Sequence, residues 1–202
     1  MMRIGCLFGT FDPPHNGHLA IADHMVAGLG LDQVWLVVTP LNPFKQAIYL
    51  SPDMHRMAMV RLAVQGHPHL VASGFELDLP KPSYTSDSLR FMRERWPQHR
   101  FDLIIGSDNL AVFHDWKDPG SILAHHRLLV YPRDGFADHL KASAYQGSPQ
   151  VRIVADAPLL QVSSTQVRSA IARWEPVDAL VPSAVLSYIR QWRLYSPAAQ
   201  RT

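Results

Sequence analysis

Cysteine is nearly absent from this sequence, since Cys6 is the only one among 202 residues. A single thiol excludes an internal disulfide, so the fold depends on burial of apolar side chains, which make up 47% of the chain. Cys6 lies within an apolar run, where we expect it to be a small buried core residue. Low cysteine content is in keeping with a reducing compartment, and we predict a cytoplasmic protein.

Long hydrophobic runs and clusters of basic residues are also lacking. No stretch approaches the roughly 18 apolar residues of a membrane span or the core of a secretory signal. Lys and Arg do not cluster, and the formal net charge of +2 is small. This balance does not favour a nucleic-acid partner; it suits small anionic metabolites and is equally typical of an unspecialised surface. Without repeats or low-complexity tracts, we expect one domain over residues 1–202.

Short apolar runs alternate with amphipathic segments along the chain, which predicts an α/β fold. Buried strands are expected at 4–8, 33–39, 101–105, 127–132 and 151–154, with strand-like alternation at 75–79. Helices are expected from about 16, 53, 85, 163 and 182 onward. In the second of these helices, the spacing predicts a buried face that includes Met54, Met57 and Leu62.

The most chemically specific stretch runs from Gly9 to His18 (GTFDPPHNGH), between the first strand and the first helix. Such a turn suits phosphate, because Gly9 permits close backbone approach and a helix capped by Asn16 presents free N–H groups. His15 and His18 are three residues apart and would project from nearly the same side, so both could reach one anion. Metal ligation is the alternative, although no cysteine or third histidine at suitable spacing accompanies the pair.

Two further strand ends carry polar side chains. Gly106 and Asp108 follow the run 101–105, where the carboxylate could accept hydrogen bonds from a ribose or an exocyclic amine, or could cap the next helix. Arg133 follows the run 127–132 and could meet an anion or only solvent. Since the carboxyl ends of parallel strands share one edge of a sheet, these residues and the first motif are expected to lie near one another.

Nearby loops and helix starts offer more candidates, each with a plainer alternative. Lys45, in the proline-restricted segment 40–45, could bind a phosphate or be solvated. Thr85 could present its hydroxyl and backbone to a ligand or cap a helix. Trp116 could line a pocket or cover the core.

The segment from Ser163 to Arg168 (SSTQVR) is similar to the first motif, because it also places polar side chains at the start of a predicted helix. Hydroxyl side chains stand at a helix start with an arginine one turn inside, which together suit a polyphosphate. An ordinary N-cap with a surface arginine is the alternative. The sequence therefore predicts two anion-binding helix starts, one near each end of the chain.

These segments, in this order, resemble the bacterial nicotinate mononucleotide adenylyltransferases of the HxGH nucleotidyltransferase superfamily. The matching motifs are GTFDP with HNGH within 9–18, SYT at 83–85, IIGSD at 104–108 with Trp116, and SSTQVR at 163–168. The resemblance implies a Rossmann-like, doubly wound, mostly parallel sheet with helices on both faces and a small C-terminal helical part at about 163–193. It also implies transfer of AMP from ATP to the phosphate of nicotinate mononucleotide, giving deamido-NAD and pyrophosphate in NAD biosynthesis, by in-line attack without a covalent intermediate.

The same resemblance implies roles for individual residues. The catalytic group is His15, His18 and Thr10. The ATP-binding residues are Gly9, Thr10, His15, His18, Gly106, Asp108, Ser163, Ser164, Thr165 and Arg168, so the first motif and the segment 163–168 are expected to meet as the two halves of one phosphate clamp. The residues for nicotinate mononucleotide are Asn42, Lys45, Tyr84, Thr85, Trp116 and Arg133. Mg²⁺ is expected to arrive with ATP and to need no protein ligand, and the partners are the two small-molecule substrates, with neither nucleic acid nor membrane.

Two positions depart from the family pattern. Phe8 precedes Gly9 where the family has paired glycines, and Asn42-Pro43-Phe44-Lys45 replaces a Pro-Pro-His sequence before the basic residue. One rival function is an adenylyltransferase for nicotinamide mononucleotide or phosphopantetheine, against which the SYT motif and Trp116 argue. Another is a nucleotide-binding module without catalysis, against which both histidines and Arg168 argue.

Overall fold

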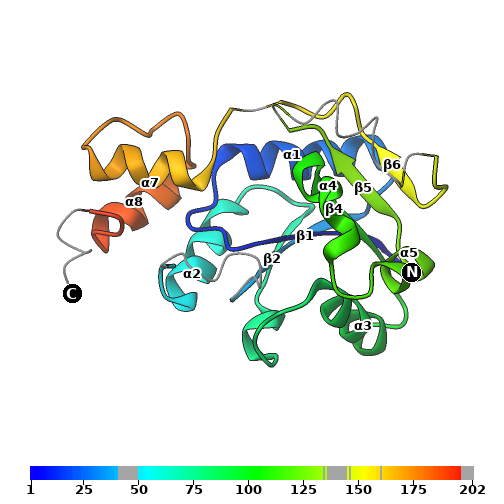
Figure 1. The fold of residues 1–202 in the computed structure, drawn as a ribbon. Coiled ribbons are helices and arrows are strands. Elements are labelled where there is room, and N and C mark those ends of the chain that lie inside the picture. Colours follow the sequence, from blue (N-terminus) through cyan, green and yellow to red (C-terminus); the bar gives the residue numbers. More distant parts are fainter. Residues whose placement is uncertain (41–49, 134, 136–144, 146, 160, 197–202) are drawn as a thin grey trace.

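A parallel six-stranded sheet forms the centre of the molecule (Figure 1). The computed structural model describes residues 1–40, 50–133, 135, 145, 147–159 and 161–196. The strands are β1 (Arg3–Gly9), β2 (Gln33–Val38), β3 (Leu70–Ser73), β4 (Arg100–Gly106), β5 (Leu128–Tyr131) and β6 (Val151–Ile153). Their order is β3-β2-β1-β4-β5-β6, and every neighbouring pair is parallel. The predicted doubly wound α/β sheet is confirmed.

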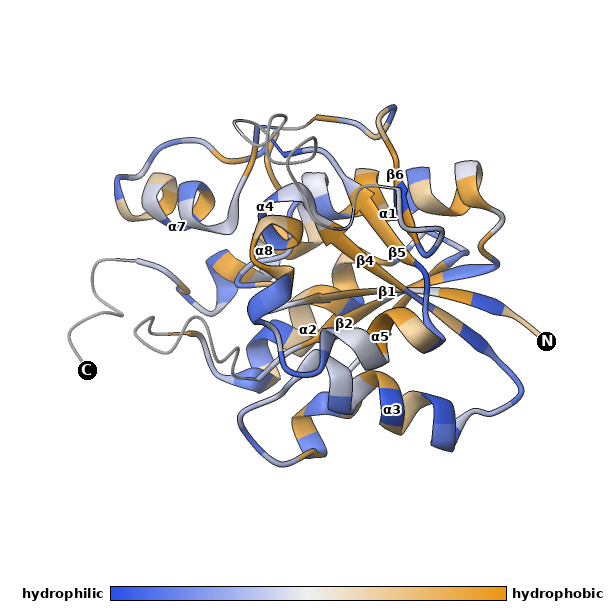
Figure 2. Ribbon diagram, turned by 45° about the vertical axis from the view of Figure 1, so that its right-hand side comes forward, coloured by the Kyte–Doolittle hydropathy of each residue, from blue (hydrophilic) through white to orange (hydrophobic). Residues whose placement is uncertain are grey.

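Helices cover both faces of the sheet. They are α1 (Asn16–Leu29), α2 (Asp53–Ala63), α3 (Thr85–Arg95), α4 (Ser107–Ala111), α5 (Pro119–His125), α7 (Ser164–Ala172) and α8 (Ser183–Gln191), with 3₁₀ turns η2 (Phe75–Asp78) and η3 (Phe113–Asp115). Side chains of α1, α2, α7 and α8 join one apolar core cluster, and those of α3, α4 and α5 join the other. The strands between them are mostly apolar, with hydrophilic residues toward their amino ends (Figure 2).

Burial on both faces explains why the strands read as continuous apolar runs. In β4, Ile104 packs in the cluster that contains α1, whereas Leu103 and Ile105 pack in the cluster on the opposite face. Cys6 is buried as predicted, and its burial raises the pKa of its thiol well above the usual value. No helix within the described ranges is long and apolar enough to cross a bilayer.

Three local predictions were wrong. Asn16 does not cap α1; His15 is the N-cap residue, while the Asn16 amide Nδ2 donates to the carbonyl of Ala179 at 2.9 Å. The alternating segment 75–79 contains a 3₁₀ turn instead of a strand, because Glu76 points into the protein. In α2, Met54 is 68% exposed and Arg56 is fully buried, since the arginine finds backbone carbonyls that satisfy it.

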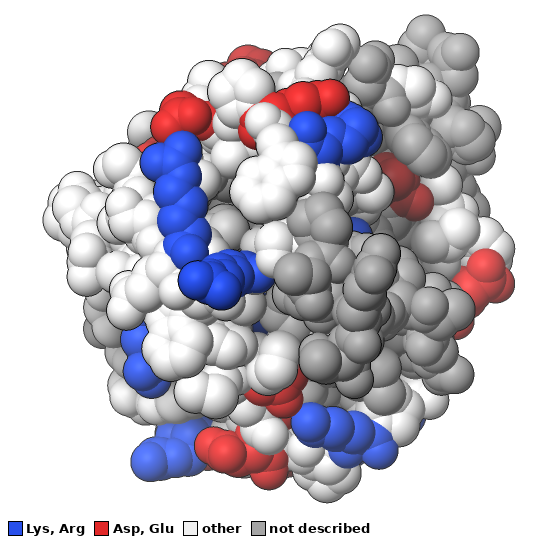
Figure 3. Space-filling model, turned by 90° about the vertical axis from the view of Figure 1, so that its left-hand side faces the viewer, with Lys and Arg blue, Asp and Glu red and all other residues white. Residues whose placement is uncertain are grey.

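The order of the strands places a crevice between β1 and β4. From β1 the chain winds outward through β2 and β3, and from β4 it winds in the opposite direction through β5 and β6. At such a reversal the connections leave a space beyond the carboxyl ends of the two central strands, where α/β proteins bind ligands. Figure 3 faces this edge of the molecule, on which basic, acidic and neutral side chains are interspersed.

Candidate active site

The first motif forms the turn between β1 and α1, as predicted, and it brings its two histidines together. The rings of His15 and His18 are stacked, with centroids 3.6 Å apart, and His18 Nδ1 accepts a hydrogen bond from the backbone N–H of His15 at 3.2 Å. Gly17 makes room for this arrangement, because a Cβ there would lie 2.8 Å from Val162 Cγ1 and 3.0 Å from His15 Nδ1. Both rings therefore present themselves at the start of one helix.

His15 is a neutral group at physiological pH. Burial lowers its pKa to about 4, and the positive charge of Arg133 acts in the same direction. Its Nδ1 atom is buried without a hydrogen-bond partner among the described residues. His15 can thus contribute a ring hydrogen bond to an anion, while the N–H groups of the α1 first turn supply the positive end of a helix dipole.

A buried arginine that the sequence analysis missed supports the loop between β1 and α1. The Arg56 guanidinium donates to the carbonyls of Thr10 at 2.7 Å, Thr39 at 2.8 Å and Ser51 at 3.0 Å. It also forms an ion pair with Asp53. Because Thr10 follows β1 and Thr39 follows β2, this one side chain ties two strand ends together. No sequence motif identifies Arg56, which occupies an ordinary position in an amphipathic helix.

Asp12 ties the same loop to the end of the described chain. Its carboxylate is fully buried and accepts hydrogen bonds from the Tyr195 hydroxyl at 2.6 Å and the Ser51 backbone N–H at 3.1 Å. Burial and the neighbouring Asp12 charge raise the pKa of Tyr195 well above its usual range, so the phenol remains a donor. The loop is thus fixed by partners far away in the sequence.

The second predicted anion site, at the start of α7, lies directly against the first. Ser163 caps α7, with its hydroxyl accepting the backbone N–H of Gln166 at 3.2 Å. The Ser164 hydroxyl donates to the carbonyl of Pro13 at 2.8 Å, and Arg168 donates to the carbonyl of Asp12 at 2.7 Å. The two helix starts, which are some 150 residues apart in sequence, meet as predicted.

A cavity of about 390 Å³ opens between α1, the end of β5 and the segment before α7. We call it the nucleotide cavity, because its lining includes His15, His18 and Ser163, to which the resemblance assigns ATP binding. Candidate residues on its wall are His15, His18, Arg133 and Ser163. Arg133, which the resemblance groups with the acceptor, lies on this wall because β5 carries it there. Its Nε lies 3.8 Å from Asp108 Oδ2, and its backbone N–H donates to the Ser107 hydroxyl at 2.8 Å.

Gly106, at the end of β4, makes room for protein side chains. A Cβ at this position would overlap the Asp108 carboxylate and come within 2.9 Å of Arg133 Cγ. The ion pair between Asp108 and Arg133 therefore occupies the space beside this glycine. Any larger residue at this position would displace that pair from the strand end.

A second cavity, of about 400 Å³, lies beside the ends of β1 and β4 and the start of α3. We call it the acceptor cavity, because its lining includes residues that the resemblance assigns to the acceptor nucleotide. Its lining includes five residues of the predicted site, namely Gly9, Tyr84, Thr85, Gly106 and Trp116, and also Phe8. Trp116 both lines this cavity and packs on the core, with its ring 5.3 Å from that of Phe113. The two alternatives for Trp116 are therefore both realised.

Lys117 and Glu76 belong to the acceptor cavity and were missed in the sequence. Lys117 Nζ lies 4.7 Å from the centroid of the Tyr84 ring and 2.6 Å from Asp87 Oδ2, so the lysine orients the aromatic wall. Glu76 accepts a hydrogen bond from the Ser88 hydroxyl, and its burial raises the pKa of its carboxyl. Lys117 adjoins Trp116 in sequence, which was the one available clue; Glu76 gave none.

Several polar atoms around the acceptor cavity are buried without a partner among the described residues. They are Glu76 Oε2, Ser83 Oγ, Ser86 Oγ and Trp116 Nε1. Buried polar atoms in proteins are nearly always paired, so four such atoms in one cavity wall indicate a place where a polar ligand binds. Tyr84, the N-cap of α3, makes no side-chain capping bond, which leaves the first N–H groups of that helix beside the same cavity.

Asn42 and Lys45 lie outside the described residues. Within the described ranges, no group of three or more His, Cys, Asp or Glu side chains is arranged to hold a metal ion.

Comparison with known proteins agrees with this geometry. Residues 6–170 match the cytidylyltransferase-like family model. The chain is 42% identical over 195 residues to a probable nicotinate-nucleotide adenylyltransferase of Cytophaga hutchinsonii and 40% identical over 194 residues to that of Flavobacterium johnsoniae, in each case covering 96% of this chain and 99% of the relative. Its fold is similar to that of Plasmodium falciparum nicotinic acid mononucleotide adenylyltransferase complexed with NaAD, with a TM-score of 0.78 at 19% identity over 96% of this chain and 98% of that one.

Proposed function

We infer the function of this chain from its family, because it belongs to the cytidylyltransferase-like family and, within it, to the nicotinate-nucleotide adenylyltransferases. It is a nucleotidyltransferase of NAD biosynthesis that transfers the adenylyl group of ATP to nicotinate mononucleotide. The observation that carries this inference is the close identity over nearly the whole of both chains. The roles of single residues below are proposals that rest on the geometry of the two cavities.

The chemistry requires alignment and charge stabilisation more than proton transfer. The attacking group is the phosphate of nicotinate mononucleotide, which is already an anion, so neither a general base nor a covalent intermediate is needed. As the bond from this oxygen to the α-phosphorus of ATP forms, the bond to the pyrophosphate oxygen breaks in line. Negative charge then builds on the α-phosphate and on the leaving group, and preorganised donors lower the barrier by stabilising it.

We assign that stabilisation to the stacked histidines and the first turn of α1. His18 is proposed as the principal donor to the phosphates in the transition state, with the neutral His15 ring beside it. Thr10 and Gly9 form the strand end below them, held by the bond from Arg56 to the Thr10 carbonyl. Hydrogen bonds within the protein hold this wall, so we expect its donors to need little reorganisation during the reaction.

The start of α7 is proposed to hold the β- and γ-phosphates. The first N–H groups of this helix, with Ser163, Ser164, Thr165 and Arg168, provide a dipole end, hydroxyls and a guanidinium. Arg168 and Ser164 already bond to the loop of the first motif, so the two phosphate sites form one clamp. Asp108 and Gly106 are proposed to lie near the adenosine. Arg133, on the wall of the nucleotide cavity, is proposed to contact a phosphate that lies between the two cavities.

The acceptor cavity is proposed to take the pyridine nucleotide. Trp116 and Tyr84 offer aromatic faces to the ring, and the free N–H groups at Thr85 can bind the nicotinate carboxylate. Contributions of Asn42 and Lys45 stay predictions from the sequence, as does the cytoplasmic location.

Mg²⁺ is proposed to arrive as the complex with ATP. The described residues of the clamp offer hydroxyls, imidazoles and arginines. The Asp12 carboxylate is bound by Tyr195 and Ser51, and the Asp108 carboxylate faces Arg133, so this donor set fits phosphate oxygens better than a protein-bound cation. When bound to ATP, the ion would neutralise part of the charge on the triphosphate.

One assay tests the function. The protein is given ATP and Mg²⁺ with nicotinate mononucleotide, nicotinamide mononucleotide or phosphopantetheine in turn, and both pyrophosphate and the adenylylated product are followed. We expect turnover with nicotinate mononucleotide and a much lower kcat/KM with the other two. No turnover with nicotinate mononucleotide would refute the proposed function, and equal turnover with the nicotinamide form would refute its specificity.

A further inference from the structure

A third cavity is lined by residues at the amino ends of β1, β4 and β5. These strand ends lie on the edge of the sheet opposite to the active site (Figure 1). Its volume of about 540 Å³ is within the range of small-molecule sites. The charged residues in its lining are Arg3, Arg93, Arg100, Arg127, Glu94 and Asp102. Four arginines against two carboxylates leave an excess of two positive charges, even with the histidines of the lining neutral.

The buried carboxylate of this cavity binds only two of the four arginines in the lining. Asp102 is buried, and both Arg3 and Arg127 bind it, with nitrogen to oxygen distances of 2.9 Å and 2.5 Å. Arg93 and Arg100 have no side-chain hydrogen bond or ion pair within the described ranges. Two guanidinium groups therefore remain available to an anion, and a planar guanidinium matches phosphate oxygens with two parallel hydrogen bonds.

A histidine in the same wall provides a third polar group. His126 is only 6% exposed, and its Nδ1 lies 2.8 Å from the carbonyl of Phe101. Since a carbonyl only accepts hydrogen bonds, Nδ1 carries the proton and Nε2 is the second polar atom of the ring, without a partner among the described residues. A buried imidazole with one nitrogen committed and the other free is a fitting contact for an acidic ligand.

Groups from three elements surround His126 and shift its pKa in opposite directions. Burial, Arg93 on α3 and the neighbouring His125 lower the pKa of His126, whereas the Phe101 carbonyl and Asp102 on β4 raise it; burial is the largest influence, and the pKa lies below that of an ordinary histidine. An anion near Nε2 would raise the pKa of His126, so proton uptake by His126 and anion binding would favour each other.

We propose that this cavity, at the amino edge of the sheet, binds a phosphate group, either as inorganic phosphate or as the phosphomonoester of a small metabolite. Arg93 and Arg100 supply the charge, and His126 Nε2 takes up a proton as the anion binds and donates it in a hydrogen bond to a phosphate oxygen. The site is separate from the adenylyl transfer machinery, so the proposal does not depend on the proposed function.

The test follows the His126 ring proton by NMR as pH is varied, with increasing inorganic phosphate at constant ionic strength. We expect phosphate to raise the pKa of His126 in a saturable manner. The double variant R93Q/R100Q should weaken phosphate binding by about 10-fold or more, since each charge-assisted hydrogen bond is worth more than 1 kcal/mol. R173Q, at an exposed arginine outside the cavity, is the matched control and should bind as the wild type does.

A second pair of measurements separates the outcomes. R93K/R100K, which keeps the charge, should recover part of the affinity, so a loss caused by misfolding is recognised. Ribose 5-phosphate that binds more tightly than inorganic phosphate would identify a metabolite ligand, and equal affinity would identify free phosphate. The proposal is overturned if phosphate leaves the pKa of His126 unchanged, or if chloride at the same ionic strength moves it equally.

Discussion

The two cavities of the active site differ in how their polar groups are paired. Around the phosphate clamp most groups bind one another, as Arg168 does with the Asp12 carbonyl and Ser164 with the Pro13 carbonyl, and His15 Nδ1 is the exception among the described residues. Around the acceptor cavity, four polar atoms are buried without partners among the described residues, including Ser83 Oγ and Trp116 Nε1. The same chain therefore builds one wall whose geometry is fixed internally and one wall whose hydrogen bonds are left for the substrate.

This difference leads to an expectation about mutations. Removing a group from the internally bonded wall should lower the turnover number or the stability of the fold, since its partners lose a bond. Removing an unpaired group from the acceptor wall should raise the KM for nicotinate mononucleotide and leave the stability nearly unchanged. The following experiments test this division, starting with the one for which we expect the largest effect.

His18→Ala removes the proposed transition-state donor from the clamp. We expect kcat to fall by about 10²-fold or more, as for other losses of a preorganised donor, with little change in the KM for nicotinate mononucleotide. Steady-state kinetics with each substrate varied in turn measure both effects. His24→Ala, further along the same helix, is the control and should retain wild-type kinetics. If the KM for the acceptor rises instead and kcat is unchanged, the division between the two walls is wrong.

His15 makes the stability of the folded protein depend on pH. Its pKa is about 4 in the folded protein against 6.5 for an ordinary histidine, so the unfolded chain binds more protons between these values. The His15 contribution to stability is therefore fully present above pH 6.5 and is lost as pH falls toward 4, by at most about 1.4 kcal/mol for each pH unit. Urea unfolding at pH 7, 6 and 5 measures the slope, which should be smaller in His15→Gln and unchanged in the control His24→Gln. Equal slopes in all three proteins would contradict the assignment.

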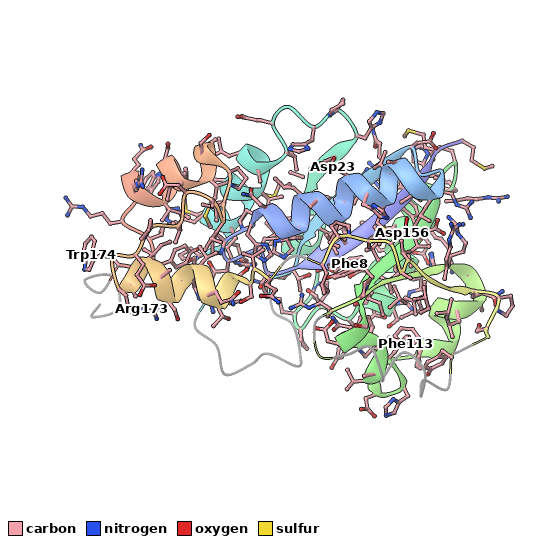
Figure 4. The ribbon with its side chains drawn as sticks, turned by 90° about the horizontal axis from the view of Figure 1, so that it is seen from above. Phe8, Asp23, Phe113, Asp156, Arg173 and Trp174 are labelled. Atoms are coloured by element: carbon pink, nitrogen blue, oxygen red, sulfur yellow. The ribbon has the colours of Figure 1, made fainter. Side chains whose placement is uncertain are left out.

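Trp116→Ala tests the acceptor wall. Loss of an aromatic stacking partner should raise the KM for nicotinate mononucleotide by about 10-fold, while the KM for ATP stays within a factor of about 2. Trp174→Ala is the matched control, because Trp174 is 81% exposed at the far end of α7 (Figure 4) and should have no effect on either KM. A rise in the KM for ATP equal to that for the acceptor would place Trp116 in both cavities.

The parts of this site that could be predicted from the sequence are those that depend on short, continuous stretches of the chain. The β1-to-α1 turn, the Gly106 strand end and the start of α7 each combine a residue pattern with a nearby strand or helix, and the two anion-binding starts meet as expected. The parallel sheet could also be anticipated, because continuous apolar runs separated by helices favour one, whereas the order of its strands was not predicted.

The missed features depend on contacts between distant residues or on one exceptional side chain. The Tyr195 hydroxyl donates to the carboxylate of Asp12, which lies 183 positions away in the sequence, and no periodic pattern of residues indicates such a pair. Arg56 occupies a helix position where arginine is normally exposed, and only the carbonyls of the β1 and β2 ends make its burial favourable. Glu76 sits in a segment whose alternation resembles a strand, so its inward direction could not be read from the pattern.

Tyr195→Phe tests how far the end of the described chain stabilises the clamp. The variant loses one hydrogen bond to the buried Asp12 carboxylate, and we expect the free energy of unfolding to fall by about 1 kcal/mol. A modest loss of kcat should accompany it, because the Asp12 loop carries the carbonyl that binds Arg168. Denaturant unfolding and steady-state kinetics provide the two measurements. Tyr188→Phe, which removes a hydroxyl bonded to the partly exposed His55, is the control and should change the stability less.

Ser83→Ala is expected to have the smallest effect on the fold and is the most direct test of the acceptor wall. Ser83 Oγ is buried without a partner within the described ranges, so removing it should change the free energy of unfolding by less than about 0.5 kcal/mol or stabilise the protein slightly. Ser88→Ala is the matched control, since the Ser88 hydroxyl donates to Glu76 and its loss should cost about 1 kcal/mol. The KM for nicotinate mononucleotide should rise a few-fold in Ser83→Ala. Equal destabilisation by both variants would mean that the Ser83 hydroxyl serves the fold, and the contrast between the two walls would then not hold at this position.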